Sequence, residues 1–303
     1  MTQLQKYTWL IDTIRRAGKI SLRDISDRWE RDKDMSDYEP LPRATFNRWK
    51  EDIRNLFGIN IECQRTGGFL YYIKNPEEFE EDGIKNWMLD SFAVGNIISQ
   101  NLALKNRILV EKIPSGRDHL TALVSAMKSD RVVNITYHPF RLKYSTTFRV
   151  EPYCVKLFEN RWYLLGRSVF FDELRIYGLD RIENVEQTDE TFRLPKNFDA
   201  AEYFSGYFGI VTDSDVPVER IIIRSNRMHA NYLRTLPLHH SQTLKGDYGE
   251  YCDFELRLAP TYDFIMKLLQ CGSMVEVIEP AKLRHQVKGW ISDMYNAYRE
   301  DLK

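Results

Sequence analysis

The chain has 303 residues, more than one ordinary compact unit, and this length predicts two or three domains. Hydrophobic residues make up 43% and aromatic residues 13%, which excludes a chain that is disordered over most of its length. The 43 Lys and Arg against 44 Asp and Glu leave a formal net charge of -1, so any nucleic-acid-binding surface has to be local.

No apolar run approaches the roughly 18 residues that a membrane span needs, and the first residues lack the apolar core of a signal peptide. We therefore expect a cytoplasmic protein without a membrane partner. The four cysteines lie far apart with no C-x-x-C pair, which argues against a zinc finger and a disulfide framework and favours buried free thiols.

Residues 1–75 are patterned as three short helices followed by a hairpin. Apolar residues recur at helical spacing within residues 4–16, within 21–30 and from Arg43 onward, where Phe46 and Trp49 begin a third apolar stripe. After Gly58, two short apolar runs flank a turn with two glycines. This layout predicts a winged helix-turn-helix domain that binds double-stranded DNA.

The start of the third helix carries the candidate DNA contacts, because residues near the N-terminus of a recognition helix meet base edges in the major groove. Glu51 and Asp52 limit the contacts to the first turns, and the insertion over residues 32–42 leaves the docking geometry open. Alternatively, the winged helix is a protein-interaction module with an ordinary solvated face. The candidate contacts are Arg43, Thr45, Asn47, Arg48 and Lys50, with Arg65 at the hairpin tip.

Three further blocks follow. Residues 76–130 are acidic and then apolar, and predict a helical linker whose last helix ends near Met127. Short β-type runs over residues 131–195 predict a small antiparallel β-barrel. Alternating strands and helices over residues 215–303 predict an α+β sandwich. The expected fold class is therefore multidomain α+β.

One run in the predicted barrel, ELRIYGLDR, carries two arginines around an aromatic ring. As a single strand, it places Arg175, Tyr177, Leu179 and Arg181 on one face. Guanidinium groups beside an aromatic ring suit phosphates, stacked bases or carboxylates. The alternative is that Asp180 and Glu173 neutralise the arginines and that Gly178 ends the strand early.

The motifs around this run resemble those of the WYL-domain family. Arg161-Trp162-Tyr163-Leu164 follows Arg149-Val150-Glu151-Pro152 and precedes Arg175-Ile-Tyr-Gly-Leu-Asp-Arg181-Ile182. The resemblance implies a bacterial, commonly homodimeric transcription regulator with an Sm-like or SH3-like barrel and a C-terminal extension domain. It also implies that the barrel senses an anionic, nucleic-acid-derived effector, such as a nucleotide or a single-stranded nucleic acid.

On the matching positions, the resemblance implies effector contacts at Tyr137, Arg149, Tyr163, Arg175 and Arg181, with His138 as a neighbour. Tyr177 joins them through the strand face described above. Trp162 and Leu164 alternate onto the same face of their strand and are expected in the core.

The chain shows no catalytic motif, so we expect no enzyme, no cofactor and no metal site. In the leading mechanism, a dimer occupies two DNA half-sites and an effector changes their separation through the linker. One rival is an accessory protein, for example of a defence system, that binds nucleic acid or a partner without promoter-specific regulation. Another is an enzyme whose site is invisible at motif level.

Overall fold

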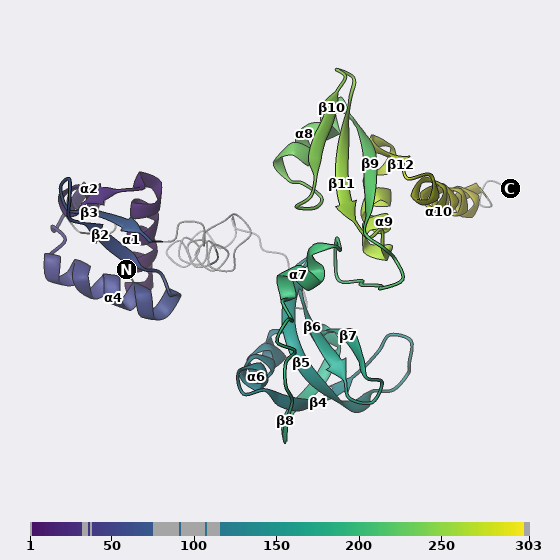
Figure 1. The fold of residues 1–303 in the computed structure, drawn as a ribbon, viewed down its shortest axis with the longest axis horizontal. Coiled ribbons are helices and arrows are strands. Elements are labelled where there is room, and N and C mark those ends of the chain that lie inside the picture. Colours follow the sequence, from purple (N-terminus) through teal and green to yellow (C-terminus); the bar gives the residue numbers. More distant parts are fainter. Residues whose placement is uncertain are drawn as a thin grey trace. The chain divides into compact units, whose positions relative to one another are not determined.

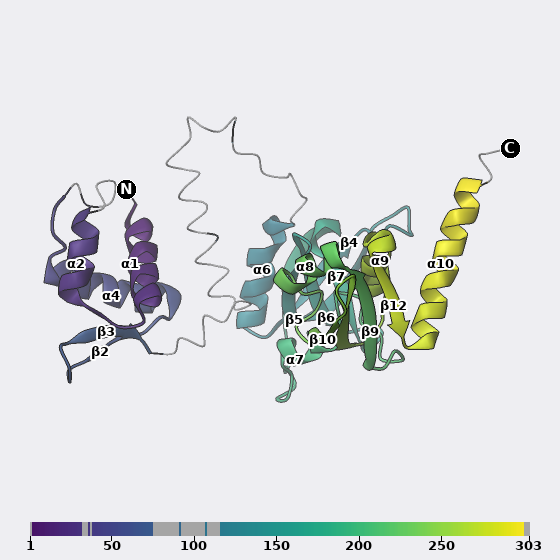
Figure 2. The ribbon, with the colours of Figure 1, turned by 90° about the horizontal axis from the view of Figure 1, so that it is seen from above.

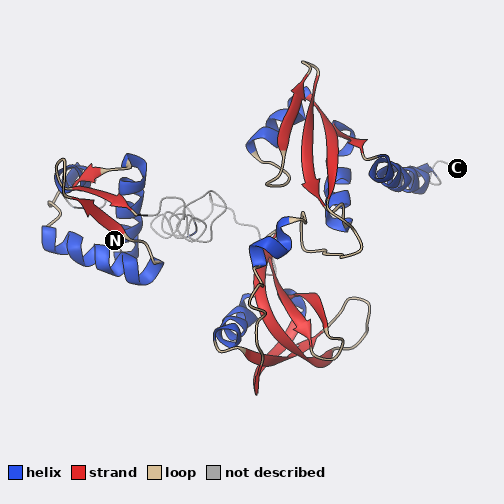
Figure 3. Cartoon of the chain, in the orientation of Figure 1, coloured by secondary structure: helices blue, strands red, loops and turns tan. Residues whose placement is uncertain are grey.

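The computed structural model describes residues 2–31, 36, 38–74, 91, 107 and 116–299. The chain divides into two compact units, residues 1–111 and 112–303, and each is described here by itself. Figure 1 labels the elements, and Figure 3 separates helices from strands. Up to residue 115, the predicted linker lies outside the described residues except for Ser91 and Arg107.

Over residues 2–31 and 38–74, the N-terminal unit shows three helices and a small antiparallel sheet, as the apolar periodicity predicts. The helices are α1 (Gln3–Ala17), α2 (Leu22–Arg31) and α4 (Arg43–Phe57). The strands β1 (Ile20–Ser21), β2 (Ile61–Gln64) and β3 (Leu70–Ile73) pair in the order β1-β3-β2. This arrangement is consistent with a winged helix-turn-helix.

Aromatic rings hold these helices together. The Trp29 ring meets the Trp9 and Trp49 rings edge-on, with centroids 5.1 Å apart in both pairs. Phe46 and Ile53 are fully buried beside Trp49, so α4 turns its apolar stripe inward and leaves its other face to solvent. The end of α4 is set by Gly58, whose positive φ of 65° suits a left-handed helix cap.

The central sheet has five antiparallel strands in the order β7-β6-β5-β4-β8. Helix α6 (Arg117–Lys128) packs against it, with Leu123 and Ala126 fully buried among side chains of the sheet. The WYL-signature residue Leu164 is buried and Trp162 packs against the same core, as the alternation predicts. The strands are β4 (Arg131–Tyr137), β5 (Thr146–Phe158), β6 (Arg161–Ser168), β7 (Glu173–Gly178) and β8 (Ile182–Thr191).

The expected closed barrel is wrong, because the pairing within residues 116–299 leaves β7 and β8 as open edges of the sheet. The predicted strand over ELRIYGLDR is also too long. It stops at Gly178, and the chain turns through a 3-10 helix, η3 (Leu179–Arg181), before β8. Leu179 is fully buried there and joins the core of the central sheet.

The C-terminal sheet has the order β10-β11-β9-β12 and confirms the predicted α+β block. Its strands are β9 (Glu219–Asn226), β10 (Thr243–Asp247), β11 (Tyr251–Leu258) and β12 (Val275–Glu279). Its helices are α8 (Arg227–Thr235), α9 (Tyr262–Gln270) and α10 (Ala281–Arg299), with a 3-10 turn, η4 (Gly272–Met274), before β12. Of the four free thiols, Cys252 and Cys271 are buried, whereas Cys63 and Cys154 are half-buried.

A short helix, α7 (Ala200–Ser205), and the following strap, residues 206–211, connect the two sheets. Lys156 Nζ on β5 donates to the Gly209 carbonyl oxygen at 2.8 Å. The Asp263 carboxylate on α9 accepts from the backbone nitrogens of Ile210 and Val211 at 2.7 and 2.8 Å. The strap is therefore held from both sides.

Among the helices within the described ranges, none combines the length and apolar character that a membrane span requires.

Candidate nucleic-acid and effector interfaces

The outward face of α4 presents the predicted DNA contacts. Arg43, Asn47 and Arg48 are exposed, and Thr45 and Lys50 are half-buried at its edges. Within the described residues, no carboxylate lies within salt-bridge distance of Arg43, Arg48 or Lys50. An exposed cation without a carboxylate partner can meet a phosphate without breaking an ion pair.

The hairpin between β2 and β3 supplies the sixth predicted contact. Arg65 is exposed at its tip, and within the described residues it too has no carboxylate partner. Gly67 and Gly68 turn the chain there with φ values of 88° and 116°, which other residues rarely adopt. Lys19 Nζ donates to Gln64 Oε1 at 2.8 Å beside this turn and adds a further positive charge to the wing.

The two acidic residues of α4 differ in their surroundings. Asp52 Oδ2 accepts a hydrogen bond from the Tyr7 hydroxyl at 2.5 Å, so this carboxylate joins α4 to α1. Burial, and next the bond to Asp52, raise the pKa of Tyr7, which keeps this donor protonated at neutral pH. Glu51 remains exposed on the outward face, where it opposes phosphate contacts beyond the first turns.

On the central sheet, three of the predicted effector contacts come together at the end of β7. The Arg181 guanidinium lies over the Tyr137 ring at 5.3 Å and over the Phe140 ring at 4.9 Å. The Tyr137 and Tyr177 rings meet edge-on at 5.5 Å. Burial raises the pKa of Tyr137 and raises that of Tyr177 to about 12, so both phenols remain neutral donors.

The glycine that ends β7 makes room for Arg181. A Cβ atom added at Gly178 would lie 2.8 Å from Arg181 Nη2 and 2.7 Å from Asp180 Oδ1. Arg181 has no carboxylate within salt-bridge distance among residues 116–299, although Asp180 pairs with Arg161 at 3.2 Å. The guanidinium of Arg181 is thus held by aromatic faces and is available to an anion.

Two of the predicted arginines, Arg175 and Arg149, do not converge on this point. Arg175 shares the strand face of Tyr177, but it lies over the Phe171 ring at 3.8 Å and pairs with Glu173 at 3.2 Å. Arg149 Nη1 pairs with Glu190 Oε1 at 2.5 Å. Its chain neighbour Val150 faces the core, so Arg149 points to the opposite face of the sheet.

The other two predicted contacts lie beside Arg181: Tyr163 pairs across the β6–β7 ladder with Gly178, and the His138 backbone nitrogen donates to the Arg181 carbonyl oxygen at 2.9 Å. Tyr163 has buried Leu164 as its neighbour and stands beside Lys156 across the β5–β6 pair, on the outer face of the sheet. His138 is exposed, and its Nε2 lies 3.2 Å from the Leu142 carbonyl oxygen. Phe140 also lies against Arg181, although it is not among the predicted contacts. The chain leaves β4 at Tyr137, so Phe140 belongs to a loop.

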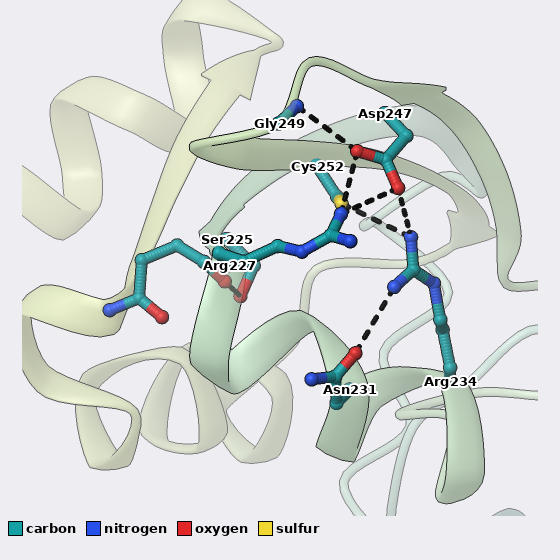
Figure 4. Close-up of polar contacts among 8 residues, drawn as sticks. Ser225, Arg227, Asn231, Arg234, Asp247, Gly249 and Cys252 are labelled. Carbon is teal, nitrogen blue, oxygen red and sulfur yellow. Dashed lines mark hydrogen bonds and ion pairs between the residues drawn. The ribbon is translucent and has the colours of Figure 1, made fainter.

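A second group of arginines lies on α8, where it meets β10 of the C-terminal sheet (Figure 4). Arg227 Nη1 lies 2.8 Å from both Asp247 oxygens, and Arg234 Nη2 donates to Asp247 Oδ2 at 2.7 Å. Hydrogen bonds from the Gly249 backbone nitrogen and from Arg234 lower the pKa of Asp247 to about 2. Because one carboxylate holds both guanidinium groups, the cluster ties α8 to β10.

No group of three or more His, Cys, Asp or Glu side chains within the described residues is arranged to hold a metal ion.

The family models match both parts of the second unit. The WYL domain model matches residues 118–187, which include α6 and nearly all of the central sheet. The WCX domain model matches residues 217–295, which include the C-terminal sheet and most of α10. The chain therefore contains a WYL domain followed by a WCX domain.

Among individual relatives, Protein PafB of Mycobacterium bovis and of Mycobacterium tuberculosis are each 32% identical to the chain over 81 residues. This match covers 27% of the chain and 24% of the relative, so the chain spans about a quarter of the length of these curated relatives.

Two solved structures are also similar to the chain. Proteasome accessory factor B/C (PafBC) of Arthrobacter aurescens is 16% identical with a TM-score of 0.36, covering 94% of this chain and 46% of that one. A CRISPR Cas-related protein is 10% identical with a TM-score of 0.25, covering 62% of this chain and 54% of that one.

Proposed function

We propose that the chain is a DNA-binding transcription regulator whose WYL domain senses an anionic, nucleic-acid-derived effector. It acts in the cytoplasm as a homodimer whose winged helices occupy two half-sites on double-stranded DNA. It performs no catalysis.

The observation that carries the DNA-binding part is the outward face of α4. Arg43 and Arg48 are exposed on its first turns, Arg65 is exposed at the wing tip, and none has a carboxylate partner within the described residues. A helix start enters the major groove while the wing reaches the flanking backbone. The charge is local, which accords with a chain whose formal net charge is only -1.

Binding to the DNA upstream of its own gene, measured over a salt series against a scrambled duplex, tests this part. We expect selective binding that weakens as salt rises, because bound phosphates release counterions. Arg48→Ala should relax specificity at one base pair by about 1–3 kcal/mol. The matched control is Lys245→Ala, which removes the same charge from exposed β10 of the C-terminal sheet and should leave binding unchanged.

The effector part rests on Arg181, which lies between the Tyr137 and Phe140 rings. A guanidinium presents planar paired donors to a phosphate, while the exposed face of Phe140 can stack on a base. Arg149 and Arg175 are held by Glu190 and Glu173 and would have to exchange these partners to bind an anion.

The effector-binding part is tested by fluorescence anisotropy with a labelled oligonucleotide of ten deoxythymidine nucleotides, with mononucleotides as competitors. Arg181→Ala should weaken binding by at least tenfold, and Arg149→Ala should weaken it less than threefold. Equal effects of the two substitutions would remove Arg181 from the site.

The rival function is an accessory nucleic-acid- or partner-binding protein without promoter-specific regulation. Equal, weak binding to the upstream and scrambled duplexes, together with oligonucleotide binding that depends on Arg181, would favour that rival.

A further inference from the structure

A pocket with aromatic and acidic walls lies where the short helix α7 meets the central sheet. Its volume is about 350 Å³, within the range of about 300–1,000 Å³ that small-molecule sites have. Figure 2 shows α7 beside β5, as Figure 1 does, and the walls come from these two elements, from β7 and from residues 195–199. The pocket shares no residue with the predicted DNA and effector contacts.

Three aromatic rings form the apolar part of the wall. The ring centroids of Tyr153 and Phe198 lie 5.1 Å apart, and their planes are inclined by 71°. The centroids of Phe198 and Tyr203 lie 6.2 Å apart with an inclination of 44°. The Tyr203 hydroxyl lies 3.1 Å from Thr212 Oγ1, a contact that holds its ring in place. The three rings are therefore inclined walls of one pocket and do not stack face to face, and Leu174 adds an aliphatic surface.

Two carboxylates in the same wall have no cation partner. Asp199 and Glu202 are exposed, and within residues 116–299 neither lies within salt-bridge distance of a Lys or Arg. Asp199 caps α7 by accepting a hydrogen bond from the Glu202 backbone nitrogen at 2.8 Å, which fixes this carboxylate at the pocket. No Lys or Arg lines the pocket. Two unpaired negative charges thus stand beside aromatic faces, and both features attract a cation.

We propose that this pocket binds an aliphatic ammonium ligand of the polyamine class. Such a ligand has ammonium groups that can pair with the carboxylates and lie over the rings, and methylene groups that can pack against Leu174 and Tyr153. An anion would be repelled by Asp199 and Glu202. A neutral apolar ligand would cover both carboxylates without pairing them, which costs free energy. The charge of the wall therefore selects an ammonium ligand.

Isothermal titration calorimetry of the full chain tests the proposal. The probe is putrescine, a diamine with four methylene groups, and butanediol serves as its uncharged analogue. We expect putrescine to bind saturably at one site per chain, and butanediol to bind at least tenfold more weakly, because it lacks the charges that meet the carboxylates and the rings.

The carboxylates are tested by the double variant Asp199→Asn with Glu202→Gln. It removes both charges and keeps the cap of α7, because an Asn side chain also accepts the capping hydrogen bond. Putrescine affinity should fall by about tenfold, as the loss of two exposed ion pairs implies. The matched control is Glu186→Gln with Glu250→Gln, which removes the same charge from exposed positions on β8 and in the β10–β11 turn and should leave the affinity unchanged.

The rings are tested by two substitutions at one position. Tyr203→Leu removes a ring from the wall and should weaken putrescine binding by about fivefold, whereas Tyr203→Phe keeps the ring and should retain the affinity within about twofold. Circular dichroism checks that each variant folds. The carboxylate variant changes only exposed side chains, so it keeps the test valid if Tyr203→Leu does not fold.

Four results would overturn the proposal: no binding of putrescine, equal binding of butanediol, equal loss in the two carboxylate double variants, or unchanged affinity in a folded Tyr203→Leu variant. The last would mean that putrescine meets an acidic surface and not this pocket.

The inference goes beyond the proposed function, because the pocket needs neither DNA nor effector. A chain that binds putrescine but no duplex would retain this site and remove the regulator. A chain that binds its operator but no putrescine would do the reverse.

Discussion

Arginines on α4 and on the central sheet differ in what surrounds them. Arg43 and Arg48 are exposed with no described carboxylate within salt-bridge distance, whereas Arg149 and Arg175 each pair with a glutamate. Both sets are exposed, so exposure alone does not separate a binding surface from a solvated one. The comparison indicates that an arginine binds a phosphate readily when no carboxylate pairs with it, because no ion pair has to be broken first. Arg181 lies over two aromatic rings and has no carboxylate within salt-bridge distance among residues 116–299, so it belongs with the first set.

The largest effect should come from α4. The double variant Arg43→Ala with Arg48→Ala should weaken duplex binding by about 100-fold or more. The slope of log affinity against log salt should fall by roughly 0.9 for each phosphate contact removed. Arg149→Ala with Arg175→Ala removes the same charge from paired positions, and its duplex affinity should change less than threefold. Equal losses of duplex affinity in the two double variants would show that pairing with a glutamate does not distinguish the two sets of arginines.

Next comes a substitution that moves Arg181 without removing it. In Gly178→Ala, the added Cβ would approach the guanidinium to 2.8 Å, and the flexible side chain would have to swing away from Tyr137. Oligonucleotide affinity, measured by anisotropy, should fall by about fivefold, which corresponds to about 1 kcal/mol. Thermal unfolding of the same variant serves as the control. Unchanged affinity would show that the position of the guanidinium is unimportant.

A smaller gain should follow when a paired cation is released. Glu190→Gln removes the carboxylate that holds Arg149 and leaves the arginine exposed. Binding of single-stranded oligonucleotide at low salt should rise about twofold to threefold, and the gain should vanish at high salt. Glu186→Gln, at another exposed site of β8 whose carboxylate accepts from the Asn184 amide, provides the control. No gain over this control would mean that pairing does not restrain Arg149.

The smallest effect concerns stability against acid. The pKa of Asp247 is about 2 in the folded chain and about 3.9 in an unfolded one. A lowered carboxyl pKa stabilises the fold fully above about pH 4, and this contribution is lost as the pH falls toward 2. The stability difference between the unchanged chain and Asp247→Asn should therefore shrink over that interval in chemical denaturation. The effect is small because water screens the exposed Asp247 carboxylate. A stability difference between the two chains that does not change with pH would contradict the prediction.

Much of the fold follows from local patterns. The helices α1, α2 and α4 and the alternation of the C-terminal block were predictable because each buries a regular apolar face. Strand β10 was not predicted, since this edge strand is polar and almost wholly exposed along its length. The closed barrel was overpredicted, because alternation within each strand says nothing about whether the edge strands pair.

The candidate effector site was only partly accessible from sequence. Alternation correctly placed Arg175 and Tyr177 on one face of β7, but it carried that face past Gly178, where the chain turns into η3. Arg149 lies on a different strand, β5, and it takes the outer face because its neighbour Val150 is buried in the core, a burial that the sequence analysis did not predict. The aromatic support of Arg181 by Phe140 required the three-dimensional path of the loop after β4.

The strap between the two sheets has a consequence for how the second unit comes apart. Its backbone is bonded by Lys156 from the WYL domain and by Asp263 from the WCX domain, and the Phe208 ring contacts Phe158 and Phe264. Neither domain can release this segment without giving up contacts of its own. Calorimetry of the chain should therefore show the two domains melting together in one cooperative transition, and proteases should spare residues 206–211 until that transition occurs.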